Sequence, residues 1–259
     1  MENNDIDINY RFAGTARLYG EEGFMRLRQS TVCIIGNGGV GSWAVEALAR
    51  SCVGHLILID GDVVAETNIN RQIQALAPNI GRPKVEVLAE RIRQINPFCQ
   101  VEPLQVFVNA GNMAEIIGSR KPDFVIDAID KVANKTELIV YCKNNNIPLL
   151  ASGGAGGKTD PTQIEICDLT RTQQEPLLAK VRRRLRSEYG FSRSLKTTYW
   201  IDAVYSKEPI CYPEKAEDGK IEVISGLNPA GFGTTMAVTA SFGLAAASYV
   251  LKKLAKMER

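Results

Sequence analysis

A glycine-rich segment, 34–41, reads Ile-Ile-Gly-Asn-Gly-Gly-Val-Gly and joins a β-rich run to a helix-like run. Gly36, Gly38 and Gly41 have the spacing G-x-G-x-x-G. In such a loop the first glycine permits a tight turn, the second lets the backbone approach a phosphate, and the third lets helix and strand pack closely. The helix N-terminus adds free N–H groups and a partial positive charge. The segment therefore predicts a nucleotide site.

Charged residues follow this loop at positions that suit a nucleotide. Asp60 ends the next aliphatic run, 24 residues after Gly36, where a carboxylate can accept hydrogen bonds from ribose hydroxyls. Lys84 follows Pro83 in the first turn of a predicted helix, where a cation opposes the helix dipole by about 0.3–1 kcal/mol. Lys84 is thus either a tolerated surface lysine or part of an anion site, and the nearby Arg71 favours the second alternative. Two cations suit a triphosphate better than the pyrophosphate of a nicotinamide cofactor.

Two acids close the fourth predicted strand in Val-Ile-Asp127-Ala-Ile-Asp130. Asp130 falls at the carboxyl end of the strand, where parallel sheets bind ligands. It could ligate Mg²⁺, a hard cation that prefers carboxylate, phosphate and water oxygens. Asp127 is expected to be buried and structural.

Other catalytic patterns are weak. The segment 152–159 resembles a P-loop, but Ser152 stands where that pattern requires glycine, and Asp160-Pro161 stops a following helix. We interpret it as a flexible loop near the site. His55 is the only histidine and is expected to be an ordinary surface residue.

The elements that must position these residues alternate along the chain. Aliphatic strands are predicted at 31–35, 56–60, 101–108, 124–129 and 147–151. Helices are predicted at 41–52, 83–95 and 133–144. Two alternating runs, 163–168 and 199–205, flank a helix over 175–188 and are typical of antiparallel strands.

This order predicts an α/β fold: a Rossmann-like, mostly parallel sheet with helices on both faces, extended by antiparallel strands in the C-terminal half. We expect a single domain over 1–259, with a nucleotide-binding part at about 28–157 and a substrate-facing elaboration at about 158–259.

Composition bounds the class of protein. The chain has 259 residues, 45% hydrophobic and 23% charged, with a net charge of +2. These values exclude a collagen, a coiled coil, a disordered tail and a disulfide miniprotein. No two of the six cysteines have C-x-x-C spacing, so a four-cysteine zinc site has no support. The acidic N-terminus carries no secretory signal pattern, so we expect reduced thiols and a cytoplasmic location.

The uncharged segment 223–251 raises the question of a membrane span. A spanning helix needs roughly 20 apolar residues. Here the apolar residues of 232–251 are diluted by threonine, serine and glycine. We therefore expect a buried core helix rather than membrane association.

A basic cluster lies in the C-terminal half. The segment 180–196 holds seven Lys or Arg and one Asp or Glu, so its net charge is +6 while the rest of the chain carries −4. It is either an RNA-contacting patch or a solvated helix face. Tyr189, Phe191, Tyr199 and Trp200 could stack on a base, although at least half of them are expected in the core. The candidate RNA contacts are Lys180, Arg182, Arg183, Arg184, Arg186, Arg193 and Lys196.

These motifs together resemble the ubiquitin-activating-enzyme-like adenylyltransferases, which form an acyl adenylate from a carboxylate and ATP. The motifs that carry the resemblance are the glycine loop, Asp60-x-Asp62, Asn68-x-x-Arg71-Gln72, Arg82-Pro-Lys84 and Asp127-x-x-Asp130. The resemblance implies ATP and Mg²⁺ as cofactors. It implies roles for Gly39 and Asp60 at the nucleoside, for Asn68, Arg71 and Lys84 at the phosphates, and for Asp130 at the metal, with Asp62 and Gln72 in the same site. It also implies a homodimer in which Arg17 reaches the neighbouring site.

Within this superfamily the chain resembles the tRNA threonylcarbamoyladenosine dehydratases over nearly its whole length. The segments concerned include 10–20, 91–97, 153–157, 160–163 and 231–233. The resemblance implies ATP-dependent cyclisation of the modified adenosine in tRNA. Three alternatives are an adenylyltransferase for a sulfur-carrier protein, an NAD-dependent oxidoreductase and a non-catalytic nucleotide-binding module. A sulfur-transfer partner is weakened because a cysteine sometimes found before the last of these segments is replaced by Gly-Leu-Asn-Pro-Ala at 226–230.

Overall fold

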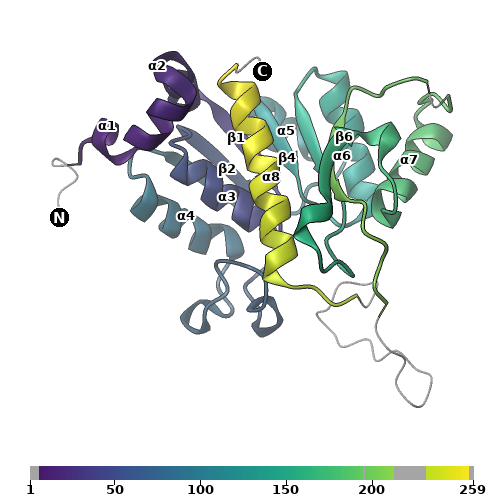
Figure 1. Ribbon diagram of the computed structural model, residues 1–259, viewed down its shortest axis with the longest axis horizontal. Helices are drawn as coiled ribbons and strands as arrows, with labels where there is room; N and C mark the ends of the chain where they lie inside the picture. Colours follow the sequence, from purple (N-terminus) through teal and green to yellow (C-terminus); the bar gives the residue numbers. More distant parts are fainter. Residues whose placement is uncertain (1–5, 195, 213–231, 257–259) are drawn as a thin grey trace.

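The computed structural model describes residues 6–194, 196–212 and 232–256, so the segment 226–230 lies outside the described residues. Its strands form one seven-stranded sheet in the order β3-β2-β1-β4-β5-β7-β6 (Figure 1). All neighbouring strands run parallel except β6, which pairs antiparallel with β7. The strands are β1 (Thr31–Ile35), β2 (His55–Ile59), β3 (Gln100–Leu104), β4 (Phe124–Asp127), β5 (Leu149–Ser152), β6 (Ile164–Asp168) and β7 (Asp202–Ser206).

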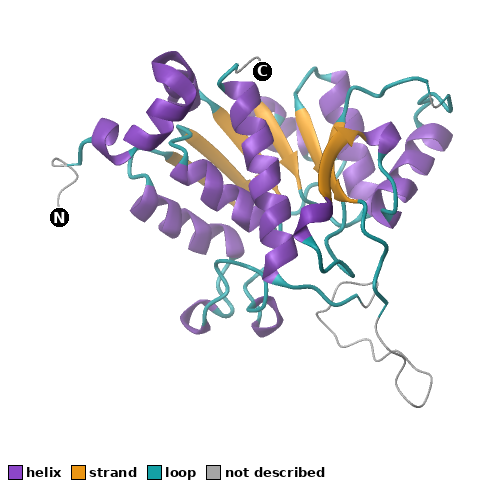
Figure 2. Cartoon of the chain, viewed as in Figure 1, coloured by secondary structure: helices purple, strands orange, loops and turns teal. Residues whose placement is uncertain are grey.

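Helices cover both faces of this sheet (Figure 2). One apolar cluster joins a face of the sheet to α3, α4 and α8, and two others join the opposite face to α5, α6 and α7. The helices are α1 (Ile8–Arg11), α2 (Ala13–Gln29), α3 (Gly41–Arg50), α4 (Lys84–Ile95), α5 (Met113–Ile116), α6 (Val132–Asn144), α7 (Pro176–Glu188) and α8 (Met236–Leu254).

The central strands are aliphatic throughout because both of their faces are covered. In β1, Val32 and Ile34 belong to the cluster beneath α3, α4 and α8, whereas Cys33 and Ile35 belong to the cluster beneath α5 and α6. This alternation follows from the two-residue period of a strand. The predicted α/β class and sheet are therefore confirmed.

The structure corrects the ends of several predicted elements. The predicted strand 101–108 ends at Leu104, and residues 106–108 leave the sheet to line a cleft. The predicted strand 199–205 begins at Asp202 and pairs parallel with β5 as well as antiparallel with β6. Hydrophobic alternation does not distinguish a parallel from an antiparallel neighbour. It reflects which side chains are buried and not which strand pairs alongside. The N-terminal helices α1 and α2 were not predicted.

Residues 236–251 of the uncharged segment lie in α8, which packs closely on α3, whereas 223–231 lie outside the described residues. A Cβ atom at Gly243 would overlap the Val40 carbonyl oxygen, so glycine is needed for this approach. Val238, Phe242 and Val250 are fully buried. The expectation of a core helix is confirmed. Among the described residues, no helix is both long and apolar enough to cross a membrane.

An ion pair is buried where β4 meets α6. The Lys135 Nζ lies 2.8 Å from the Asp127 Oδ1, and both side chains are 0% exposed. Lys135 also donates to the Asp127 backbone carbonyl, and Asp127 accepts a hydrogen bond from the Ile129 backbone N–H at 3.0 Å. Burial raises the pKa of the Asp127 carboxyl, and the Lys135 ammonium opposes that rise. The pair fixes the turn after β4, as expected for a structural Asp127.

Replacing Lys135 should leave an unpaired buried carboxyl. We expect Lys135→Met to lower the free energy of unfolding by about 3–5 kcal/mol, measured by urea denaturation. The matched control is Lys207→Met, because Lys207 pairs with Glu165 at 2.6 Å with about half of each side chain exposed. The control should change the stability by less than about 1 kcal/mol. Equal effects of the two substitutions would contradict the structural role of the buried pair.

Candidate functional site

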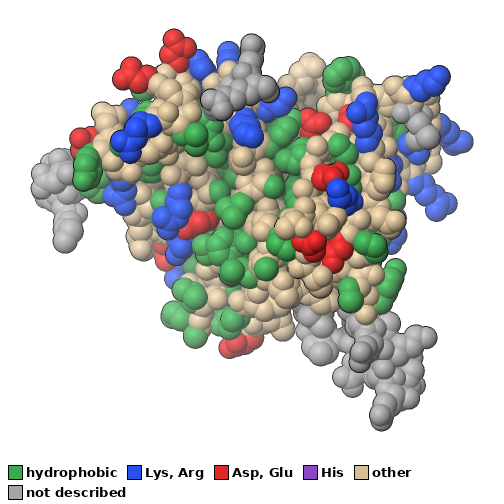
Figure 3. Space-filling view, in the orientation of Figure 1, with side chains coloured by type: hydrophobic (Ala, Val, Ile, Leu, Met, Phe, Trp, Pro, Cys, Tyr) green, Lys and Arg blue, Asp and Glu red, His purple; other side chains and the backbone are tan. Residues whose placement is uncertain are grey.

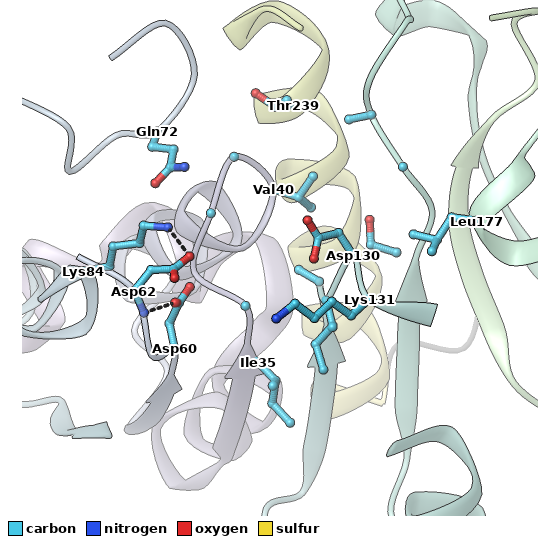
Figure 4. Close-up of a pocket in the computed structure, with 18 of the residues that line it drawn as sticks. Ile35, Val40, Asp60, Asp62, Gln72, Lys84, Asp130, Lys131, Leu177 and Thr239 are labelled. Carbon is cyan, nitrogen blue, oxygen red and sulfur yellow. Dashed lines mark hydrogen bonds and ion pairs between the residues drawn. The ribbon is translucent and has the colours of Figure 1, made fainter. Parts of the chain in front are cut away.

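A cleft of about 380 Å³ opens at the carboxyl ends of β1, β2, β4 and β5 (Figure 4). This is the edge where parallel α/β sheets bind ligands, and the volume is within the range of small-molecule sites. The sequence-predicted residues that line the cleft are Gly36, Gly38, Gly39, Asp60, Asp62, Asn68, Arg71, Gln72, Lys84 and Asp130.

The glycine loop after β1 is shaped by two close backbone approaches. Gly36 has a φ of +88°, and a Cβ there would lie 2.8 Å from the Ala128 carbonyl oxygen. A Cβ at Gly41 would overlap the carbonyl oxygen of Gly36. By contrast, the nearest atom to a Cβ at Gly38 lies 3.8 Å away, in Gln72. The loop is therefore tight at its two ends and roomier at Gly38, the glycine whose backbone was predicted to approach a phosphate.

Asp60 links the loop after β1 to the loop after β2. Its Oδ2 accepts from the Asn37 backbone N–H at 2.6 Å, and its Oδ1 accepts from the Asp62 backbone N–H at 2.9 Å. Burial raises the pKa of Asp60, while the Lys84 charge and the two N–H groups lower it. Because a carboxylate oxygen can accept more than one hydrogen bond, this arrangement still allows contact with ribose hydroxyls.

Lys84 is held inside the cleft rather than on the surface. It is the first residue of α4 and only 5% exposed, and its Nζ lies 3.0 Å from the Asp62 Oδ2 (Figure 4). The cation opposes the helix dipole at this position, and the Asp62 carboxylate offsets that cost. The burial of Lys84 rules out the surface-lysine alternative, and its part in an anion site stays a prediction. Pro83 precedes the helix instead of occupying its first position, a correction of one residue.

The segment between β2 and α4 brings further polar groups to the cleft. The Arg71 Nη1 donates to the Thr67 carbonyl at 2.7 Å and to the Asn70 Oδ1 at 2.9 Å, and burial lowers the pKa of Arg71. Asn68 is 6% exposed and accepts from the Ala65 backbone N–H at 3.1 Å. These bonds hold Arg71 and Asn68 at the cleft in fixed positions.

Asp130 lines the cleft and is exposed, whereas Asp127 is buried. Figure 4 shows the Asp130 carboxylate beside Lys131 at the end of β4. In the described part of the chain no three His, Cys, Asp or Glu side chains cluster as a metal site. Mg²⁺ is commonly held by one or two carboxylates together with phosphate and water oxygens, so its assignment to Asp130 stays a prediction.

The segment 152–157, called the second glycine loop below, forms one wall of the cleft. Lys158 follows it but is 2% exposed, and its Nζ donates to the Gln174 carbonyl at 3.1 Å. Burial lowers the pKa of Lys158. The lysine is thus bonded to the protein itself, in agreement with the rejection of a P-loop.

Some cleft residues were not found from the sequence. They include Phe107, Lys131, Asn134, Phe232 and Thr239. Thr239 comes from α8, far along the chain, and carries no motif. Phe107 lay within the predicted strand 101–108. Nothing in the local sequence indicated that it belongs to a loop at the cleft.

Two residues predicted for the nucleotide site, Gly41 and Arg17, do not line the cleft. Arg17 is exposed on α2 and does not line it. His55, which was expected to be a surface residue, is instead partly buried in β2, with its Nε2 4.0 Å from the Glu102 Oε2. All six cysteines are free.

The basic segment 180–196 divides into two sets. Figure 3 shows Lys and Arg side chains gathered at the edge of the molecule where Figure 1 places α7. Arg182, Arg184 and Arg186 are partly buried and donate hydrogen bonds to other protein groups. The exposed cations of this segment are Lys180, Arg183, Arg193 and Lys196.

The aromatic residues near this basic segment also divide. Phe191 and Tyr199 pack edge to face with ring centroids 4.9 Å apart, and Tyr199 is buried. Trp200 is 86% exposed and Tyr189 is 37% exposed. Half of the four aromatic side chains thus belong to the core, as expected.

Residues 12–259 match the model of the ThiF family. The chain belongs to the ThiF family. A ThiF-family relative from Haemophilus influenzae, a tRNA threonylcarbamoyladenosine dehydratase, is 49% identical, with 95% of this chain and 94% of the relative covered. The solved structure of Escherichia coli tRNA N6-threonylcarbamoyladenosine dehydratase in complex with ATP is similar to this chain with a TM-score of 0.86, at 48% identity over 95% of this chain and 94% of that one. The sulfur carrier protein ThiS adenylyltransferase of Escherichia coli is 35% identical over 52% of this chain and 53% of its own. The predicted family is confirmed.

The close approach at Gly41 is testable by substitution. Gly41→Ala should lower the free energy of unfolding by about 3 kcal/mol, because its methyl group meets rigid backbone. Thermal unfolding monitored by circular dichroism measures this loss. Gly14→Ala in α2 is the control, since no atom lies within 4 Å of a Cβ there. Unfolding of both variants at the same temperature as the parent protein would contradict the close contact between Gly41 and the Gly36 carbonyl.

Proposed function

We propose that this chain catalyses the ATP-dependent dehydration of threonylcarbamoyladenosine in tRNA, giving the cyclic nucleoside, AMP and pyrophosphate. The similarity to dehydratases of known name over 95% of the chain carries this proposal. The cleft supports it, because the buried Lys84 and the half-buried Arg71 line it together with the glycine loop. We expect the enzyme to act in the cytoplasm.

The proposed reaction uses two nucleophiles that both belong to the substrate. The threonyl carboxylate attacks the α-phosphate of ATP, forming an acyl adenylate and releasing pyrophosphate. The ureido group then attacks the activated carbonyl carbon, closes the ring and expels AMP. The oxygen formally lost as water leaves within AMP. The protein needs no nucleophilic side chain and acts by positioning the substrates and stabilising charge.

Six of the cleft residues have an assigned role in this reaction. Gly39 and Asp60 contact the nucleoside, while Asn68, Arg71 and Lys84 bind the phosphates. Lys84 is already charge-paired with Asp62, so the phosphates would share an ammonium that the protein holds in place. Mg²⁺ held by Asp130 would offset the charge that develops on the phosphate oxygens.

A homodimer completes the proposed site. Arg17 lies on the exposed face of α2, outside the cleft of its own subunit. On the family resemblance we assign it to the cleft of the second subunit, where its guanidinium would bind the phosphates of ATP.

The alternatives explain less of the chain. The relative that activates a sulfur-carrier protein matches only about half of it, whereas the dehydratases match the C-terminal part as well. An NAD-dependent oxidoreductase gives no role to Lys84 or Asp130. A tRNA substrate gives a role both to the nucleotide cleft and to the basic helix α7.

The decisive experiment incubates the protein with ATP, Mg²⁺ and tRNA bearing threonylcarbamoyladenosine, and then weighs the nucleosides. We expect the modified nucleoside to lose one water, with one AMP and one pyrophosphate formed per nucleoside. Lys84→Ala should lower turnover about 100- to 1000-fold, because a preorganised charge at the phosphates is removed. Lys252→Ala, an exposed lysine of α8, is the control and should keep full activity. No mass change with folded parent protein would refute the proposed function.

The exposed cations on and after α7 are proposed to bind the phosphates of the tRNA backbone. The double substitution Arg183→Glu and Arg193→Glu should weaken tRNA binding at least tenfold and make the affinity less dependent on salt. The slope of log affinity against log salt should fall by about one unit for each phosphate that the variant no longer neutralises. Filter binding at several salt concentrations measures both quantities. The control, Arg93→Glu with Lys252→Glu, changes the net charge equally on α4 and α8. Equal effects in the two double variants would show that only the net charge matters.

A further inference from the structure

Glu175 connects the second glycine loop to the start of α7. Its side chain is buried, with the residue only 5% exposed. Its Oε1 accepts from the Gly154 backbone N–H at 2.9 Å and from the Leu177 backbone N–H at 3.3 Å, and its Oε2 accepts from the Leu178 backbone N–H. One carboxylate oxygen therefore bridges the loop and the first turn of the helix.

The loop is also attached at its other end. The buried Lys158 donates from its Nζ to the backbone carbonyls of Gln174 and Glu208. The Glu208 carboxylate in turn accepts from the Thr159 backbone N–H at 2.9 Å. Both ends of the second glycine loop are thus joined to the chain segments that lead into α7 and out of β7.

The second glycine loop packs tightly against the Glu175 side chain. A Cβ atom at Gly153 would lie 2.9 Å from the Glu175 Cγ, and one at Gly154 would lie 3.2 Å from the Glu175 Oε1. The loop backbone therefore rests directly on this side chain, and a displacement of the carboxylate displaces the loop.

The two joined elements face different parts of the substrate. Gly153 and Gly154 line the cleft, as does Leu177 from the first turn of α7 (Figure 4). Farther along the same helix, Lys180 and Arg183 are exposed. Glu175 therefore lies between the wall of the nucleotide cleft and the helix that the proposed function assigns to tRNA.

We propose that Glu175 is a positioning residue, which holds the second glycine loop against α7 so that a tRNA bound along α7 presents its threonyl carboxylate in line with the α-phosphate of ATP. This rests on the proposed function. Glu175 itself touches neither substrate. Its contribution arises because a reacting group displaced by about 1 Å can lose roughly 100-fold in rate even when both substrates still bind.

A simpler role for Glu175 would be that of an N-cap alone. An N-cap stabilises the helix by satisfying its first N–H groups and has no effect on chemistry once the protein is folded. The two roles differ in what they predict for kcat at saturating substrates, because a cap changes only the population of folded protein.

The test compares Glu175→Ala and Glu175→Gln with the parent enzyme, using ATP and the threonylcarbamoyladenosine-bearing tRNA. Glu175→Ala should lower kcat about 100-fold at saturating substrates. The Kd for ATP and the Kd for tRNA should stay within twofold, because the cleft cations and the exposed cations of α7 are unchanged. Glu175→Gln keeps one oxygen acceptor for the Gly154 backbone N–H. Its kcat should therefore be about tenfold higher than that of Glu175→Ala.

Asp7→Ala is the matched control. Asp7 caps α1 by accepting from two backbone N–H groups, those of Asn9 and Tyr10, and does not line the cleft. Its removal should leave kcat unchanged.

Three outcomes overturn the positioning role: parental kcat in Glu175→Ala with only a lower melting temperature, losses of ATP or tRNA affinity as large as the loss of kcat, or no recovery in Glu175→Gln. If Glu175→Ala does not fold, Glu175→Gln decides the question, with an expected kcat about tenfold below that of the parent. Absence of product with the parent enzyme would instead refute the proposed function, so the two failures are distinguishable.

Discussion

The contact between Gly41 and the carbonyl group of Gly36 is the constraint on which the cleft depends. Only a residue without a side chain lets α3 begin directly against the turn that ends β1. The helix then starts at the edge of the sheet, and its positive end lies beside the glycine loop, where the Ser42 backbone N–H donates to the Gly38 carbonyl at 3.1 Å. The same placement sets the distance at which α8 packs on α3, because Gly243 rests against Val40 at the end of the loop.

Three acids in and near the cleft have partners that compensate for their removal from water. Asp60 accepts hydrogen bonds from two backbone N–H groups, Asp62 pairs with Lys84, and the deeper Asp127 pairs with Lys135. Charges removed from water are tolerated in a protein when they are paired or hydrogen-bonded. The result is a polar cleft whose side chains are already held in place, so that little ordering is needed when a charged ligand binds.

Part of the cleft wall comes from the C-terminal half of the chain. The second glycine loop and the first turn of α7 contribute to it, and the start of α8 lies beside the nucleotide loop, where a Cβ at Gly39 would be 3.2 Å from Thr239. Their contacts join residues that are distant in sequence, such as Gly154 and Glu175 or Lys158 and Glu208. The segment that follows the nucleotide-binding part therefore contributes residues to the site as well as strands to the sheet.

The sequence by itself determined the sheet, the nucleotide loop and ten of the residues that line the cleft. Aliphatic runs, glycine spacing and the acids at strand ends are local signals, since each reflects the burial or backbone geometry of its own segment. The tertiary structure alone decided that Lys84 is buried against Asp62, that three of the arginines in 180–196 are bonded to the protein while Arg183 and Arg193 are exposed, and that Thr239 reaches the cleft. These features depend on contacts between segments far apart in the chain, and no local pattern encodes which distant segments meet.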